Sequence, residues 1–337
     1  MLKRLFQTKQ PFLFIESDLA VFYNIDDLHV DAPVVTIGSF DGVHCGHRAL
    51  LQQVVDLACQ NACRSVALTF ATHPRMLLDA STPARWLLNT PDEKIALLSQ
   101  YGIDDILMLP FDRTMAQLSA SDFVRNVMVG KLKTKYWVAG DDHSFGKDKG
   151  GNAENISLLA QSYNIEIVKV NLKKYEGICV EDKQFLFAGK ISSSSIRQAL
   201  LDGDLETANR MLGYDYPISG KVVTGKQLGR TIGFPTANIE PLSCKLLPKE
   251  GVYSANIRLD GETLKGMLYI GKQPVMKTHN EQSYIEVHIF DFDRNIYGKE
   301  LQVSLTHRIR DSIAFNNMEQ LKAQLKKDGE TSKRVNE

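Results

Sequence analysis

The distribution of apolar residues divides the chain into two parts with different periodicities. Up to about residue 202, short apolar runs alternate with segments whose apolar residues recur every three to four positions. The runs that predict strands cover 34–37, 65–70, 106–109, 136–139 and 165–168. The segments that predict helices begin near residues 47, 91, 121 and 152. This β-α-β alternation predicts an α/β fold, a parallel sheet with helices on both faces.

After about residue 213 the pattern changes to short β-type runs. They cover 221–223, 252–257, 264–270, 284–290 and 301–305, and a helical pattern follows at 318–327. Asp260-Gly261 between two of these runs is a strong hairpin signal. This half predicts an all-β fold, a small antiparallel barrel with a terminal helix. We therefore expect domains at 1–202 and 214–337, joined by a linker at 203–213.

The densest chemical signal in the first half is G-S-F-D-G-V-H-C-G-H at residues 38–47, between a predicted buried strand and an amphipathic helix. Ligands bind outside the carboxyl ends of parallel strands, and a helix N-terminus attracts phosphate. His44 and His47 add two side-chain donors there, which favours nucleotidyl transfer. A zinc site is the alternative, but Cys45 and His73 leave its ligand set incomplete.

Three further segments are expected at the same edge of the sheet. T-F-A-T-H-P at 69–74 follows the second strand, and G-D-D-H-S-F-G at 140–146 carries carboxylates suited to ribose hydroxyls or a metal. K-I-S-S-S-S-I-R at 190–197 combines serine hydroxyls with Lys190 and Arg197. Each segment alone is typical of a cap or turn, but together they predict an anion cradle opposite the histidines.

The second half carries L-G-R-T-I-G-F-P-T-A-N at 228–238, which alone is typical of a glycine-rich barrel turn. Thr236 and Asn238 stand two residues apart, so in an extended segment both side chains face one side and can share Mg²⁺. Glu286 lies in a predicted strand. An inward carboxylate there can act as a base, an outward one is the ordinary alternative, and the sequence leaves the face open.

In this order, the motifs resemble the bacterial bifunctional riboflavin kinase/FAD synthetase family over nearly the whole chain. I-Y-G-K at 296–299, R-I-R at 308–310 and Phe315 extend the resemblance. It implies a Rossmann-like nucleotidyltransferase domain followed by a six-stranded barrel. It further implies that the barrel converts riboflavin and ATP to FMN and ADP. The N-terminal domain would then transfer AMP from ATP to FMN, giving FAD and pyrophosphate.

The resemblance also implies roles for individual residues. His44 and His47, with Arg197, would stabilise charge as pyrophosphate leaves, and Glu286 would take the proton of the riboflavin 5′-hydroxyl. The implied nucleotide- and phosphate-binding residues are Gly38, Phe40, Asp41, Gly46, Asp142, Lys190, Ser193, Ser194, Gly229 and Arg230. The implied Mg²⁺ ligands are Thr236 and Asn238, and the implied flavin-binding residues are Arg310 and Phe315.

Some positions depart from the pattern of the family. Ser194 stands where threonine is common, a change that keeps the hydroxyl. Tyr269 precedes Ile270-Gly271 where asparagine is frequent, and Val275 stands where threonine is frequent. These changes motivate one alternative, a flavin- or nucleotide-binding regulator with an inactive kinase site. A second alternative is adenylyl transfer to another acceptor, because several nucleotidyltransferase families share H-x-G-H.

Charge and hydropathy restrict the partners. Lysine plus arginine and aspartate plus glutamate number 40 each, so overall charge gives no support for a nucleic-acid partner. No segment has the roughly 20 apolar residues that span a membrane, and the apolar run at 12–15 lacks a signal-peptide cleavage pattern. We expect a cytoplasmic enzyme that uses riboflavin, FMN and ATP, and the sequence leaves homo-oligomer formation open.

Overall fold

The fold was analysed in a computed structural model that describes residues 19–140, 145–147, 151, 153–170, 191–225, 228–271 and 284–335. The chain forms two compact units, Met1–Ser192 and Ser193–Glu337. The functional domains expected at 1–202 and 214–337 remain a prediction, because compact packing does not assign an activity to the residues near the boundary. No helix in the described ranges combines the length and the hydropathy needed to cross a membrane.

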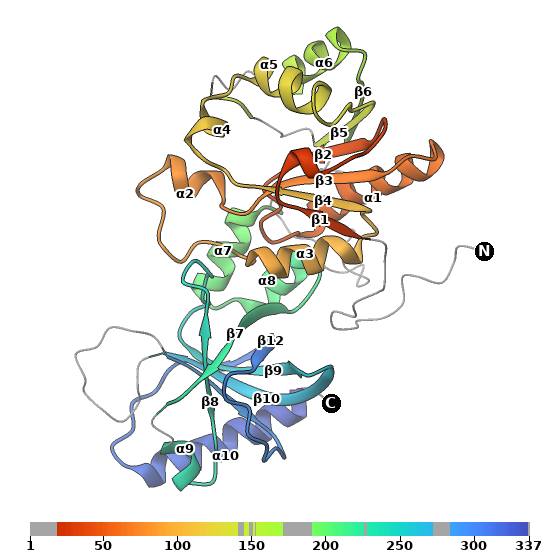
Figure 1. The fold of residues 1–337 in the computed structure, drawn as a ribbon. Coiled ribbons are helices and arrows are strands. Elements are labelled where there is room, and N and C mark those ends of the chain that lie inside the picture. Colours follow the sequence, from red (N-terminus) through yellow and green to blue (C-terminus); the bar gives the residue numbers. More distant parts are fainter. Residues whose placement is uncertain are drawn as a thin grey trace. The chain divides into compact units, whose positions relative to one another are not determined.

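Within the described residues, the first unit is built on a six-stranded sheet with the order β1-β4-β3-β2-β5-β6 (Figure 1). Its strands are β1 (Ala20–Phe22), β2 (Val34–Ile37), β3 (Ser65–Phe70), β4 (Asp105–Leu109), β5 (Tyr136–Gly140) and β6 (Glu166–Val170). Every neighbouring pair is parallel. Every residue of β2, β3 and β4 is buried, which explains their continuous apolar runs. The predicted parallel sheet is confirmed.

Helices cover both faces of this sheet. The α-helices of the unit are α1 (Cys45–Gln60), α2 (Pro74–Leu78), α3 (Pro91–Gln100), α4 (Arg113–Gln117), α5 (Ala120–Phe123) and α6 (Ala153–Ser162). A 3₁₀ turn at Ile25–Asp27 follows β1, and a π-helical turn at Val124–Val129 continues α5. The α1 helix packs on β2, β3 and β5. On the other face, Val35 and Ile37 share a core with side chains of α5 and α6.

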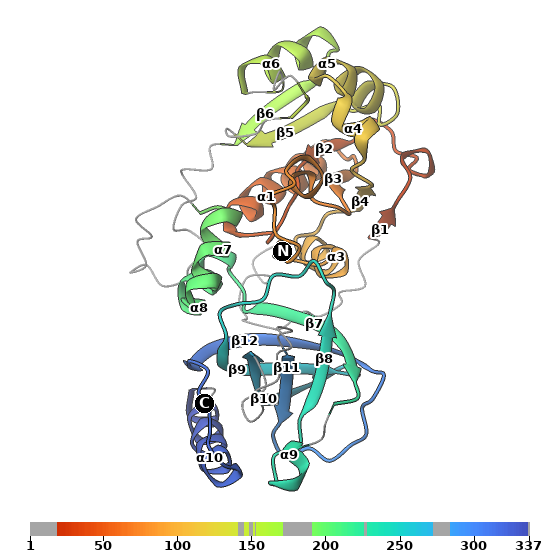
Figure 2. The same ribbon diagram turned by 90° about the vertical axis from the view of Figure 1, so that its left-hand side faces the viewer.

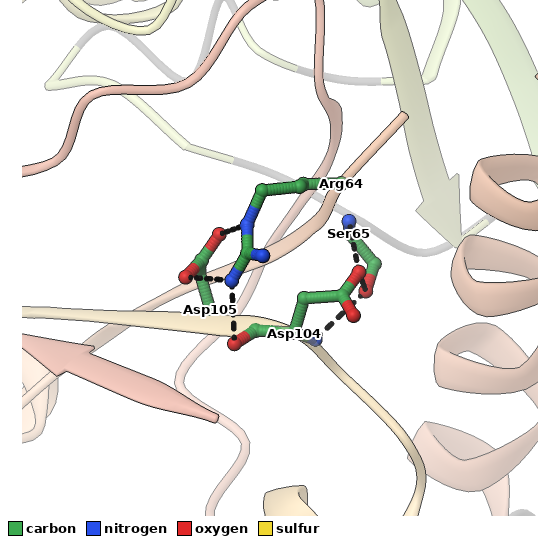
Figure 3. A network of polar contacts seen from close by, with 4 residues as sticks. All are labelled: Arg64, Ser65, Asp104 and Asp105. Carbon is green, nitrogen blue, oxygen red and sulfur yellow. Dashed lines mark hydrogen bonds and ion pairs between the residues drawn. The ribbon is translucent and has the colours of Figure 1, made fainter. Parts of the chain in front are cut away.

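A polar network joins β3 to β4 at their amino-terminal ends (Figure 3). The Arg64 guanidinium donates to both carboxylate oxygens of Asp105, at 2.5 and 2.6 Å. The Asp104 carboxylate accepts from the backbone N–H and the hydroxyl of Ser65, at 2.8 and 2.7 Å. Because ligands of such sheets bind at the opposite, carboxyl edge, this network supports the fold rather than a site.

The second unit begins with α7 (Ser193–Asp202) and α8 (Leu205–Leu212), which pack on each other. A closed antiparallel barrel follows, with the order β10-β11-β8-β7-β12-β9 (Figure 2). Its strands are β7 (Tyr216–Val223), β8 (Ala237–Pro241), β9 (Gly251–Leu259), β10 (Glu262–Gly271), β11 (Tyr284–Ile289) and β12 (Glu300–Arg310). The short α9 (Leu228–Thr231) precedes β8, and α10 (Met318–Val335) packs on β9, β10 and β12. The predicted six-stranded barrel with a terminal helix is confirmed.

The observed elements differ from the sequence expectations at several points, including the short helices α2 and α4, which were not expected. The periodicity did not reveal β1 or β8, and α10 extends to Val335 instead of ending near residue 327. The hairpin expected at Asp260-Gly261 does connect β9 to β10. Both of its turn residues have positive φ, 49° and 85°, which is why the Asp-Gly pair suits that turn.

Candidate active sites

The turn that follows β2 is tight and strained. The Gly38 N–H donates to the Leu68 carbonyl at 3.1 Å, and the next residues turn sharply toward α1. Phe40 and Val43 have φ of 44° and 34°, positive values that are strained for residues with a side chain. Such strain is found mostly at functional sites. The Phe40 side chain is 1% exposed, and a Cβ added at Gly38 would stand 3.0 Å from its ring. Glycine at position 38 therefore lets this ring fold under the turn.

His44 and His47 lie together at the start of α1. His44 is the N-cap, and its Nδ1 accepts a hydrogen bond from the His47 backbone N–H at 3.4 Å. Their rings stack with centroids 3.8 Å apart and planes 17° from parallel. A Cβ at Gly46 would stand 3.2 Å from Cε1 of His44, so this glycine makes room for the stack. Because Nδ1 of His44 is an acceptor, the neutral ring carries its proton on Nε2.

His47 has an environment that disfavours its charged form. Phe40 contacts the His47 ring edge-on at 5.2 Å, and Nδ1 of His47 is buried without a hydrogen-bond partner in the part of the chain that the structure describes. Burial, followed by the nearby His44 and Lys94, lowers the pKa of His47 well below its ordinary value. His47 is therefore neutral near pH 7 in the ligand-free protein, and its buried Nδ1 is unpartnered among the described residues.

Asp41 holds the turn against the segment that leads to α3. Its buried carboxylate accepts from the backbone N–H groups of Leu88 and Asn89, at 2.9 and 3.3 Å. The nucleotide-binding role that the sequence predicts for Asp41 stays a prediction. This contact fixes the turn relative to α3.

Sequence reasoning missed Lys94 of α3, whose side chain lies beside this turn and is 5% exposed. Its Nζ donates to the carbonyls of Ser39 and Phe70, at 2.8 and 2.9 Å, and lies 3.4 Å from Oγ1 of Thr69. Burial lowers the pKa of Lys94 to about 8, an effect that the nearby Asp41 carboxylate opposes. The available signal was its position on the helix, three and four residues before the buried leucines at 97 and 98.

The predicted cradle residues lie in two settings. Ser193, Ser194 and Arg197 occupy the first turns of α7, in the second unit, where Arg197 is 4% exposed and Ser194 is exposed. Their approach to the two histidines stays a prediction. Asp142 and Lys190 lie outside the described residues.

The second set of predicted residues forms a row across three barrel strands. Glu286 on β11 pairs with Asn238 on β8 and, on its other side, with Tyr269 on β10. The neighbours of Glu286 in β11, Ile285 and Val287, are buried, whereas Glu286 is half-buried on the opposite face. Glu286 therefore faces away from the barrel core, which is the outward placement that the sequence analysis set against a role as a base. A role as a base has to rest on the half-buried environment of Glu286 outside the core.

Thr236 contacts Glu286 just before β8 begins. Its hydroxyl donates to Oε2 of Glu286 at 3.4 Å. Burial raises the pKa of Glu286, and the hydrogen bond from Thr236 opposes that shift. His288 supports the same turn, because its Nδ1 lies 2.7 Å from the Pro235 carbonyl oxygen. The arrangement gives a carboxylate with raised basicity next to a hydroxyl and an amide.

These oxygens fit a hard divalent cation. Hydroxyl, amide and carboxylate oxygens of Thr236, Asn238 and Glu286 are a donor set that suits Mg²⁺, which keeps waters and shares phosphate oxygens. Groups of three or more histidine, cysteine or acidic side chains placed to hold a metal are absent from the described part of the chain. A cation in this row would therefore depend on substrate phosphate for much of its coordination.

Gly229 and Arg230 lie in α9, which forms part of the loop before Thr236. The Phe234 N–H donates to the Gly229 carbonyl at 2.9 Å, and a Cβ at Gly229 would stand 2.2 Å from the Phe234 carbonyl oxygen. Glycine is thus required at position 229 for the loop to close. Arg230 is exposed, and its predicted phosphate contact stays a prediction.

Arg310 is held by a residue that sequence reasoning missed. Its Nε and Nη2 donate to the buried carboxylate of Asp328 on α10, at 2.9 and 2.6 Å, and its guanidinium lies 5.9 Å from the Phe315 ring. The pair anchors α10 to β12. The flavin-binding roles of Arg310 and Phe315 remain predictions.

The departure from the family pattern at Tyr269 falls inside the barrel row. Its hydroxyl lies 2.9 Å from the Ser312 hydroxyl, beyond the end of β12, and burial raises the pKa of the phenol. Tyr269 therefore connects the strand opposite Glu286 to the segment that leads to α10. Val275 lies outside the described residues.

Comparison with protein families matches both halves of the chain. The family model described as FAD synthetase matches residues 28–184, and the one described as riboflavin kinase matches residues 212–336. The first match covers the turn with His44 and His47, and the second covers the row with Glu286.

Individual relatives match over nearly the full length. Bifunctional riboflavin kinase/FMN adenylyltransferases of Listeria monocytogenes and Haemophilus influenzae are each 38% identical, over 88% and 89% of this chain and 90% and 92% of theirs. A crystal structure titled a macrolide-efflux protein from Streptococcus pneumoniae shares the fold, with a TM-score of 0.80 and 33% identity over 94% of this chain and 98% of that one. The chain therefore belongs to the family of bifunctional riboflavin kinase/FMN adenylyltransferases, which phosphorylate riboflavin to FMN and adenylylate FMN to FAD.

Proposed function

We propose that the two activities use two separate sets of residues, one centred on the histidine turn of the first unit and one on the barrel of the second. FMN adenylylation takes place at the turn of residues 38–47, and riboflavin phosphorylation takes place at the row of Asn238, Glu286 and Tyr269. The supporting observation is that each unit has its own arrangement of groups suited to phosphate chemistry. FMN is then the product of one site and the substrate of the other.

In adenylyl transfer, a phosphate oxygen of FMN attacks the α-phosphorus of ATP. The bond from that phosphorus to the bridging oxygen breaks, and pyrophosphate leaves with the bonding electrons. No covalent intermediate on the protein is required, so the protein acts by positioning and by stabilising negative charge. The N-terminus of α1 and the Nε2–H of His44 are donors placed for that charge.

His47 suits the same task because it enters the reaction neutral. A bound polyphosphate supplies the negative charge that favours protonation of a histidine whose pKa is lowered in the free protein. His47 then hydrogen-bonds the leaving pyrophosphate with increasing strength as charge develops. Ser193, Ser194, Arg197, Lys190 and Asp142 complete this site in our proposal, on the strength of the family pattern.

In riboflavin phosphorylation, the 5′-hydroxyl oxygen attacks the γ-phosphorus of ATP and ADP leaves. Glu286 accepts the hydroxyl proton, for which its raised pKa and its half-buried position suit it. Thr236 orients the carboxylate through its hydroxyl. When Mg²⁺ is bound by Thr236 and Asn238, it supplies charge neutralisation at the phosphate oxygens. Arg310 and Phe315 would border the flavin.

The proposal extends to the setting of the enzyme. Both reactions consume ATP, which supports a cytoplasmic location, and we propose no nucleic-acid partner. The functional domains would be 1–202 and 214–337, so that α7 serves the adenylyltransferase although it packs with the second unit.

A product assay tests this proposal. The full chain is incubated with ATP and Mg²⁺ plus either riboflavin or FMN, and flavins are separated by chromatography. We expect FMN and then FAD from riboflavin, and FAD with pyrophosphate from FMN. Tight flavin binding without turnover would indicate the regulator instead, and FMN accumulation without FAD would indicate another acceptor.

A further inference from the structure

We propose that Lys94 is a positioning residue for adenylyl transfer, which holds the histidine turn in its active geometry through the carbonyls of Ser39 and Phe70. This inference rests on the proposed adenylyl-transfer site. Lys94 extends from α3 to the ends of β2 and β3, where its ammonium group donates to both carbonyls at 2.8 and 2.9 Å. The Ser39 carbonyl lies within the turn itself, between Gly38 and Phe40.

The burial of Lys94 is costly, which argues against an incidental position. Lysine is almost never fully buried unless its charge is compensated, and an apolar side chain of similar length would fill the same space. An apolar substitute would take this donor from the Phe70 carbonyl and leave the Ser39 carbonyl with the Thr69 hydroxyl alone, at 3.2 Å, at a turn that already contains strained residues. Lys94 therefore stabilises a particular conformation of the turn rather than the core alone.

The three protons of the ammonium group match its three neighbours. Two go to the carbonyls, and the third lies toward Oγ1 of Thr69 at 3.4 Å. A neutral amine has only two protons and one lone pair, so it keeps the Thr69 contact only if the Thr69 hydroxyl turns away from the Ser39 carbonyl, to which it donates at 3.2 Å. The hydrogen bonds to the two carbonyls also lose their charge assistance on deprotonation. The turn is thus held best when Lys94 is charged.

Charged groups around Lys94 come from the turn rather than from the strands. The carboxylate of Asp41 attracts the ammonium, and Lys94 in turn disfavours protonation of His47. On its own helix, the adjacent Glu93 is engaged with the Thr90 N–H at the helix start. The neighbouring ends of β2 and β3 contribute the Ser39 and Phe70 carbonyls and the Thr69 hydroxyl. The positive charge of Lys94 therefore also adds to the potential that a polyphosphate meets at this turn.

The test compares Lys94→Met, Lys94→Arg and the matched control Lys133→Met, which removes an exposed lysine of the same unit. In Lys94→Met, we expect kcat for FMN adenylylation to fall about 100-fold, with a much smaller rise in KM for ATP. Riboflavin phosphorylation by the same chain should stay within about twofold of wild type, which reports that the second unit is folded. An unchanged circular-dichroism spectrum and Tm report that the first unit is folded as well. Equal losses in both activities, or a lower Tm with unchanged kcat, would overturn the proposal.

The pH profile supplies a readout that a purely structural role would not change. In the wild type, we expect FMN adenylylation to fall as Lys94 loses its proton above a pH of about 8, while riboflavin phosphorylation does not follow it. Lys94→Arg keeps its charge and should move this fall to higher pH. A wild-type profile without the fall, or the same fall in a folded Lys94→Arg variant, contradicts the proposal. If the Lys94 proposal fails in this way but FAD formation still depends on His47, the proposed adenylyl-transfer site is retained and only the role of Lys94 is rejected.

Discussion

His44 and His47 stack with their ring centroids 3.8 Å apart, and the backbone N–H of His47 donates a hydrogen bond to Nδ1 of His44. The residue that caps the start of α1 is therefore also one of the two candidate phosphate donors. Protonation of both rings would place like charges in contact, which is one reason that His47 resists protonation. The negative charge of a bound polyphosphate, rather than a fall in solution pH, therefore favours protonation of this pair.

The lowered pKa of His47 makes the first unit sensitive to acid. Because the folded-state pKa lies below the unfolded value of 6.5, the unfolded chain binds more protons as pH falls through 6.5, and stability is lost. We expect the difference in unfolding free energy between wild type and His47→Asn to change in disfavour of wild type when the pH is lowered from about 7.5 to about 5. Urea unfolding at both pH values measures this difference. The exposed His29→Asn variant is the control, and a difference independent of pH would contradict the burial of a neutral His47.

A substitution at Gly46 should affect the histidine stack and the stability of α1 in opposite directions. Alanine at this helical position should stabilise the helix by up to about 1 kcal/mol. Its Cβ would nevertheless meet the His44 ring at 3.2 Å, so we expect Gly46→Ala to keep its Tm and to lose at least about tenfold in FAD formation. Gly329→Ala in α10 is the control, since its Cβ would stand 3.8 Å from the nearest atom. Wild-type turnover in Gly46→Ala would show that the stack is dispensable.

Thr236 should tune the basicity of Glu286. The hydrogen bond from its hydroxyl lowers a carboxyl pKa that burial has raised, so Thr236→Val should raise that pKa further. A base works only when deprotonated, and the acidic limb of kcat/KM for riboflavin phosphorylation should therefore move to higher pH. Because Thr236 is also a proposed Mg²⁺ ligand, Thr236→Val should lower kcat/KM at every pH, and the readout is the position of the limb rather than its height. Thr236→Ser keeps the hydroxyl and should restore the limb. If the acidic limb of Thr236→Val stays at its wild-type pH, Glu286 is not the group that accepts the proton.

The Arg64–Asp105 pair should respond differently to the loss of each partner. Asp105 is 2% exposed, whereas Arg64 is 45% exposed and can return to water. Arg64→Met leaves a buried carboxylate alone, and we expect it to cost about 3–5 kcal/mol in urea unfolding. Asp105→Asn should cost less, and both variants should keep both activities at 25 °C. A larger loss for Asp105→Asn would contradict this asymmetry.

The sequence predicted the parallel sheet because its central strands are buried on both faces and so appear as continuous apolar runs. It also predicted the position of the histidine turn, because a strand followed by glycines and an amphipathic helix has few other geometries. The β8 strand was missed for the converse reason. It follows a glycine- and proline-containing loop, and its strand character depends on pairing with β7 and β11.

Single buried charges were beyond the sequence pattern. Lys94 follows two acidic residues at the start of a helix, where a solvated lysine is the ordinary expectation, yet its partners lie 55 and 24 residues away. Asp328 likewise lies in a strongly polar helix, and only the fold brings it to Arg310. The choice between the two faces of β11 for Glu286 also required the barrel, because alternation alone does not say which face is covered.

The central claim is that two separate sites act in sequence, and a pair of variants tests it most directly. His47→Ala and Glu286→Gln are each assayed with riboflavin and, separately, with FMN. We expect His47→Ala to form FMN normally while FAD formation falls about 100-fold, and Glu286→Gln to show the reverse. The loss of both activities in either folded variant would contradict two separate sites.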